Sequence, residues 1–213
     1  MQAIERLNNS HDWITLVFVF LLVLLFVLKN INPMELKGYA KAYFLKGFVE
    51  EKTTEKASFF TVFNLLLFLF FTVVVSFFLL SVLPIFRVQY SLSFSLFAQV
   101  FLLVIAYFSL LLFFEYLLVK LLDIQSSVRY FILGKLSYLY TAALWLFPVL
   151  VMDYYSFSNP YLSAGIFTIL IFINCWLIFT NNKNLILNKL FYFILYLCAL
   201  KITPLLVLFK LTA

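Results

Sequence analysis

The chain has 213 residues, of which 66% are hydrophobic and 11% charged, and its mean hydropathy is +1.10. Soluble domains carry about 25% charged residues, so this composition excludes an ordinary water-soluble domain. The net charge of +6 does not indicate nucleic-acid binding, because no basic run is interleaved with aromatic residues on a polar surface. The sequence predicts an all-α membrane protein that forms a single transmembrane domain over residues 1–213.

Apolar runs suited to membrane-spanning helices, which need about 20 residues each, recur along the chain. The six runs cover approximately residues 13–28, 59–86, 91–122, 136–152, 160–180 and 190–210. We interpret the first as a retained span rather than a signal peptide, since no basic lead or small-residue cleavage site accompanies it. Pro33 marks a break after this span. The prediction is a six-helix transmembrane bundle.

Residues 34–58 form the one substantial polar segment and are predicted to be an amphipathic helix in the membrane interface. Leu36, Tyr39, Ala40 and Tyr43 recur at helical spacing, and the lysines of the segment lie off this stripe. The segment is either a docking surface, for another subunit or for anionic lipid, or an ordinary interfacial connector, which is the commoner case. The residues assigned to docking are Lys37, Lys41, Tyr43, Phe44 and Lys46.

The segments after residue 58 are predicted from their apolar runs and from the short polar gaps between them. The second and third runs are separated only by residues 87–90 and are expected to form a long hairpin, itself a candidate docking surface. Residues 123–135 are expected to be a connector or a short interfacial helix. The fourth span is expected to end near Pro148 and Asp153, and residues 153–160 to form an outer loop rich in aromatic residues. Packing must rely on large side chains, because four glycines provide no GxxxG contact face.

Positive charge alternates between the gaps that separate the spans. The gaps after the first, third and fifth spans hold eleven of the fifteen Lys and Arg residues: Lys29, Lys37, Lys41, Lys46, Lys52, Lys56, Lys120, Arg129, Lys135, Lys183 and Lys189. Cytoplasmic loops carry an excess of Lys and Arg, so these gaps are assigned to the cytoplasm and both termini to the periplasmic side.

Two ionisable residues are expected at membrane depth, where a charged group costs at least ~2.5–3.5 kcal/mol at the helix centre. Glu115 lies about two turns inside the third span, and Lys201 lies midway along the sixth, beside Thr203 and Pro204. The proline would free a backbone carbonyl that could partner the lysine. These residues are interpreted either as a structural ion pair, the more economical case, or as a proton- or ion-coupled element.

No catalytic motif is recognisable, so we expect a protein that is not an enzyme. The lone His11 excludes a bis-histidine haem and a His-rich zinc site, and neither a metal nor another cofactor is expected. Cys175 and Cys198 lie in apolar runs without CxxC spacing and are expected to be buried, unreactive thiols.

The segment Tyr192 to Lys210, which contains Cys198, Lys201 and Pro204, together with the Asp12–Thr15 opening of the first span, resembles a family of uncharacterised bacterial inner-membrane proteins labelled as a domain of unknown function. The resemblance covers essentially the whole chain and implies a polytopic helical fold in the bacterial inner membrane, with no assigned activity. Such proteins occur in bacteria that use type IX secretion and gliding. An acidic residue is expected where this chain has Lys201, and this departure weakens a family-wide proton relay.

The sequence thus favours a non-enzymatic subunit or scaffold of a larger inner-membrane complex, in contact with the lipid bilayer and with other membrane-protein subunits. A link to type IX secretion or gliding, and hence to protein transport, is suggested by the resemblance alone. The alternative is a small proton- or ion-coupled transporter or motor component that uses Glu115 and Lys201. A membrane enzyme acting on a lipid substrate ranks last.

Overall fold

The computed structural model describes residues 12–44, 47–48, 61–83, 93–121, 125–157 and 160–181. Within these residues every regular element is a helix, which confirms the all-α prediction for this part of the chain. In chain order the helices are α1 (Asp12–Ile31), α2 (Pro33–Lys41), α4 (Val62–Val82), α5 (Phe94–Leu121), α6 (Gln125–Met152), the π-helical turn η2 (Asp153–Phe157) and α7 (Pro160–Asn181).

Four helical stretches of the described residues are long and apolar enough to cross a membrane. They are Asp12–Ile31, Val62–Val82, Phe94–Phe114 and Leu133–Ser156, and a shorter apolar stretch, Ala164–Leu177, lies within α7. Their length and composition are consistent with a membrane protein. The sixth predicted span, 190–210, falls outside the described residues, so the count of six spans stays a prediction.

A capped corner joins α1 to α2. Asn32 lies between the two helices, and its side-chain oxygen accepts a hydrogen bond of 3.2 Å from the backbone N–H of Glu35. The Asn32 amide in turn donates to the Glu35 carboxylate at 3.0 Å. Pro33 occupies the first turn of α2, where its missing N–H costs nothing. These features end α1 and start α2 in a new direction, at the break expected near Pro33.

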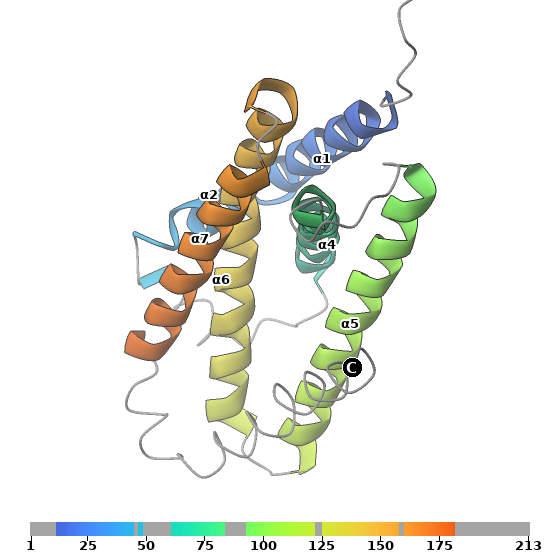
Figure 1. The fold of residues 1–213 in the computed structure, drawn as a ribbon. Coiled ribbons are helices and arrows are strands. Elements are labelled where there is room, and N and C mark those ends of the chain that lie inside the picture. Colours follow the sequence, from blue (N-terminus) through green and yellow to red (C-terminus); the bar gives the residue numbers. More distant parts are fainter. Residues whose placement is uncertain are drawn as a thin grey trace, which may run out of the picture.

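Helix α4 is the centre of the fold. It contacts α1, α5, α6 and α7, and Figure 1 shows it nearly end-on between α5 and α6. Thr61 caps its N-terminus by accepting a hydrogen bond of 3.2 Å from the backbone N–H of Asn64. Side chains around most of its circumference are buried, which is the pattern of a helix surrounded by others.

Aromatic side chains hold α4 to its neighbours. The Phe77 ring lies 4.8 Å from that of Phe18 on α1, 5.8 Å from Phe97 on α5 and 6.5 Å from Tyr154 on η2. Farther along α4, the Phe78 ring lies 3.9 Å from Phe167 on α7. Ring pairs with centroids about 4.5–7 Å apart, such as those of Phe77, add about 0.5–1.5 kcal/mol beyond the area that they bury. Large side chains therefore take the place that small residues occupy in many membrane bundles, as the scarcity of glycine predicted.

The second half of the chain differs from expectation at two places. The predicted connector 123–135 and the predicted fourth span are largely one continuous helix, because α6 begins at Gln125. This helix passes through Pro148 and ends at Met152, next to Asp153, where the fourth span was expected to end. A proline removes one hydrogen bond, which a packed helix can forgo. The expected outer loop then begins as η2, where Tyr155 forms a hydrogen bond of 2.8 Å with the hydroxyl of Thr15 on α1.

Candidate functional site at the exposed face of α2

Helix α2 is held against α6 through its own backbone. The Thr141 hydroxyl lies 3.0 Å from the carbonyl of Tyr39, and the indole N–H of Trp145 donates to the carbonyl of Ala40 at 3.1 Å. Both carbonyls belong to the last turn of α2, and the Tyr39 carbonyl also accepts a hydrogen bond of 3.3 Å from the backbone N–H of Ala42. Tyr39 and Ala42 are buried, so hydrogen bonds and apolar contacts together fix this helix in place.

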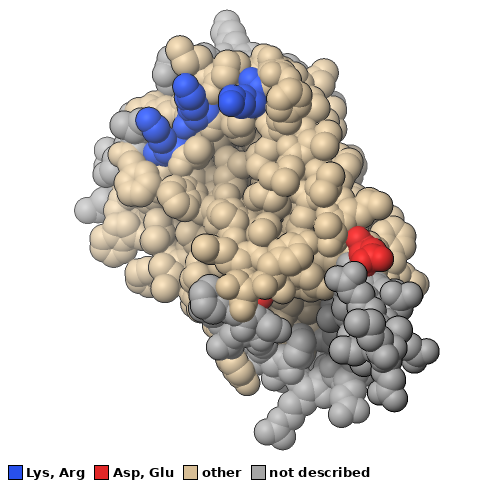
Figure 2. Space-filling view, turned by 90° about the horizontal axis from the view of Figure 1, so that it is seen from above, with Lys and Arg blue, Asp and Glu red and all other residues tan. Residues whose placement is uncertain are grey.

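The opposite face of α2 is basic. Lys37 and Lys41 are exposed one turn apart, and Lys29 is exposed in the last turn of α1. Figure 2 shows the Lys and Arg side chains gathered at one edge of the face seen from above, with the acidic side chains elsewhere. Glu35, the nearest acidic residue in sequence, is engaged by Asn32. Among the described residues, this face is therefore a concentration of positive charge.

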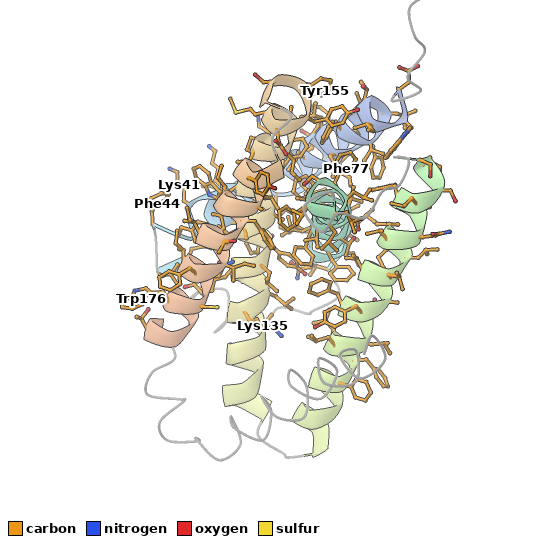
Figure 3. The ribbon with its side chains drawn as sticks, in the orientation of Figure 1. Lys41, Phe44, Phe77, Lys135, Tyr155 and Trp176 are labelled. Carbon is orange, nitrogen blue, oxygen red and sulfur yellow. The ribbon has the colours of Figure 1, made fainter. Side chains whose placement is uncertain are left out.

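An exposed aromatic side chain adjoins these lysines. Phe44 is 76% exposed, and its ring contacts that of Trp145 edge-on at 6.3 Å between centroids. Figure 3 shows Lys41 and Phe44 close together on the same side of the molecule. We call the surface formed by Lys29, Lys37, Lys41 and Phe44 the α2 face. Its chemistry suits recognition of a partner that combines negative charge with apolar groups.

Gly38 permits the close approach of Phe48 to α2. A β-carbon at Gly38 would overlap the Phe48 ring, whereas one at Gly47 would meet no atom within 4 Å. The Phe48 ring also lies edge-on to Tyr39 at 5.2 Å, so it has a fixed place in the packing.

We expect Gly38→Ala to displace Phe48 and to lower the free energy of unfolding by about 1 kcal/mol. Overpacking costs about 1–3 kcal/mol. The higher helix propensity of alanine offsets up to about 1 kcal/mol of this cost. Unfolding of the purified protein in detergent measures the change. Gly47→Ala is the matched control and should not destabilise the protein. Equal effects of the two substitutions on the free energy of unfolding would show that the contact between Gly38 and Phe48 does not contribute to stability.

Tyr43 points away from the α2 face. It is half-buried, and its hydroxyl lies beside the side chain of Asn174 on α7. Burial raises the pKa of the Tyr43 phenol, an effect that the neighbouring Asn174 partly offsets, so the phenol stays protonated. The structure shows no hydrogen bond between the two side chains. Tyr43 was assigned to docking with Lys37, Lys41 and Phe44, and only the latter three lie on the exposed surface.

The structure does not describe the side chains of the other predicted site residues. Lys46, Lys201, Thr203 and Pro204 lie outside the described residues. Glu115 is on α5, within its last two turns, and its side chain is likewise outside the description. The predicted pairing of Glu115 with Lys201 therefore stays a prediction.

Two further residues of α7 bear on the site. Neither polar atom of the buried Asn174 amide has a hydrogen-bond partner among the residues that the structure describes. Cys175 was expected to be buried and is exposed; Cys198 lies outside the described residues. Among the residues described, no group of three or more His, Cys, Asp or Glu is placed to hold a metal ion.

Comparison with known proteins yields one relationship. No curated protein and no solved structure matches the chain. A family model described as a domain of unknown function (DUF4271) matches residues 14–212, which is nearly the whole chain. The predicted resemblance is thereby confirmed at the level of the family. This protein belongs to the DUF4271 family.

Proposed function

We propose that this protein is a non-enzymatic, integral subunit of a larger membrane complex and that a partner subunit docks on the α2 face. The observation that carries the proposal is the fixed presentation of Lys37, Lys41 and Phe44. Hydrogen bonds from Thr141 and Trp145 hold α2 from behind, so its exposed face is preorganised. A rigid surface loses less conformational entropy on association than a mobile one, which favours stable binding.

The composition of the face supports a protein partner. Exposed aromatic side chains that pack against a second aromatic ring are typical anchors of interfaces, and Phe44 rests against Trp145. The surrounding lysines would steer an acidic partner and select against basic ones. In this proposal the chain crosses the bacterial inner membrane six times, with α2 on the cytoplasmic side and both termini in the periplasm. On the family resemblance alone, components of type IX secretion and gliding are the first partners to seek.

Reversal of the two α2 charges tests the proposal. The tagged full-length protein is purified from native membranes in mild detergent, and its partners are quantified by mass spectrometry. We expect Lys37→Glu/Lys41→Glu to reduce recovery of the partner at least tenfold, or about 1.4 kcal/mol, because attraction becomes repulsion. Lys37→Arg/Lys41→Arg retains both charges and should retain the partner. Failure of the wild-type protein to retain any partner, or equal recovery with both variants, would contradict the proposal.

A further inference from the structure

Three buried polar atoms lie close together where the turn after α2 meets α7. They are the Tyr43 hydroxyl and both polar atoms of the Asn174 amide, and among the residues that the structure describes none of the three has a hydrogen-bond partner. Asn174 is only 5% exposed. An amide offers two donors and two acceptor sites, so this is a concentrated set of unused hydrogen-bonding capacity.

The described side chains around these atoms are mostly apolar. Ala42, Tyr138 and Leu177 form a small buried cluster against which Tyr43 packs. Leu177 follows Asn174 by one helical turn and lies on the same face of α7. Leaving a buried donor or acceptor unsatisfied is costly, and in membrane proteins the lipid provides no partner. A further polar group at this position would remove that cost.

We propose that Tyr43 and Asn174 bind a single water molecule that bridges the phenol and the amide. Water is the smallest group with both donors and acceptors, and a buried water commonly makes about three hydrogen bonds. The phenol can donate one, the Asn174 carbonyl can accept a second, and the Asn174 N–H can donate a third. Such a bridge ties the turn at Ala42–Phe44 to α7. It is independent of whether a partner occupies the α2 face.

The position of the bridge gives it a consequence for the exposed surface. Tyr43 lies between Ala42, which is buried, and Phe44, which is exposed. A water bound to Tyr43 therefore positions Phe44 through one peptide unit. A water-mediated contact is almost as favourable in enthalpy as a direct hydrogen bond. Because the water can exchange, the contact stabilises the position of the turn and still allows it to shift.

Magnetisation transfer from water to the Asn174 side-chain amide tests this site. Solid-state NMR is performed on the full-length protein, labelled with ¹⁵N-asparagine, in lipid bilayers; the Asn174 signal is the one absent from Asn174→Leu. If that variant does not fold, Asn174→Gln, which moves the signal to an unlabelled residue type, serves the same purpose. We expect rapid transfer in the wild type and its loss in Tyr43→Phe, which removes one of the three bonds. Tyr107→Phe, at an exposed tyrosine on α5, is the matched control and should retain the transfer.

Two results would overturn the inference. Absence of transfer in the wild type would mean that the two side chains bond directly or stay unpaired. Undiminished transfer in Tyr43→Phe would mean that any water at Asn174 is not held by the phenol.

Discussion

Replacement of Phe77 by alanine is expected to destabilise the fold by about 3–5 kcal/mol, the range measured for the loss of buried aromatic side chains. Phe77 is 5% exposed and contacts aromatic rings of α1, α5 and η2. Figure 3 places it where α1 passes α4. Its truncation would leave a cavity at a junction of several helices, which cannot collapse without moving all of them.

Reversible unfolding of the purified protein in mixed detergent micelles measures this loss. Phe113→Ala is the matched control, because Phe113 on α5 is 57% exposed and, within the described part of the chain, its ring lies against that of Phe114 on the same helix. The control should change the unfolding free energy by less than about 1 kcal/mol. Comparable losses at Phe77 and Phe113 would mean that the aromatic cluster does not hold the helices together.

The second large effect is expected from the pair Thr141→Val and Trp145→Phe, which removes both side-chain contacts to the α2 carbonyls. Valine matches threonine in shape, and phenylalanine preserves the ring of tryptophan without its N–H. Each hydrogen bond contributes about 0.5–1.5 kcal/mol, because the Tyr39 carbonyl keeps the Ala42 N–H and the Trp145 bond is exposed. Hydrogen exchange within residues 33–44 should accelerate about 5- to 150-fold, since about 1–3 kcal/mol of local stability is lost. Partner recovery should fall in parallel.

The same chemical changes elsewhere on the chain are the controls. Thr168 bonds to the carbonyl of Ala164 within its own helix, so Thr168→Val alters a threonine without loosening a helix–helix contact. Trp176→Phe does the same for an indole that is 63% exposed. Both should leave hydrogen exchange at α2 unchanged. If the Thr141/Trp145 variant also left it unchanged, α2 would be held by apolar packing alone.

Much of the helical framework was predictable because its signals are local. Hydropathy located the cores of α1, α4 and α5 to within a few residues, and Pro33 marked the corner before α2. The start of α6 was missed because residues 125–135 are polar enough to resemble a connector, while nothing in them breaks a helix. Hydropathy reports the edge of an apolar run, and a helix can continue past that edge.

In the candidate site, too, the local features were predictable from the sequence and the tertiary contacts were not. The period of 3.6 residues correctly separated the buried Tyr39 from the exposed Lys37 and Lys41 on α2. The hydrogen bonds from Thr141 and Trp145 join residues more than one hundred positions apart, and no local pattern distinguishes these two from other residues of an apolar helix. Tyr43 follows the apolar stripe, but its pairing with Asn174 depends on where α7 packs. Tertiary contacts of this kind are decided by the whole fold.

Photocrosslinking from position 44 tests most directly whether the α2 face binds a protein. p-Benzoylphenylalanine replaces Phe44 in the full-length chain, and native membranes are irradiated before solubilisation. We predict a defined protein adduct from position 44, its loss when Lys37→Glu/Lys41→Glu is added, and no such adduct from position 113, which is also exposed. Crosslinking only to lipid at position 44, or the same protein adducts from both positions, would contradict the account.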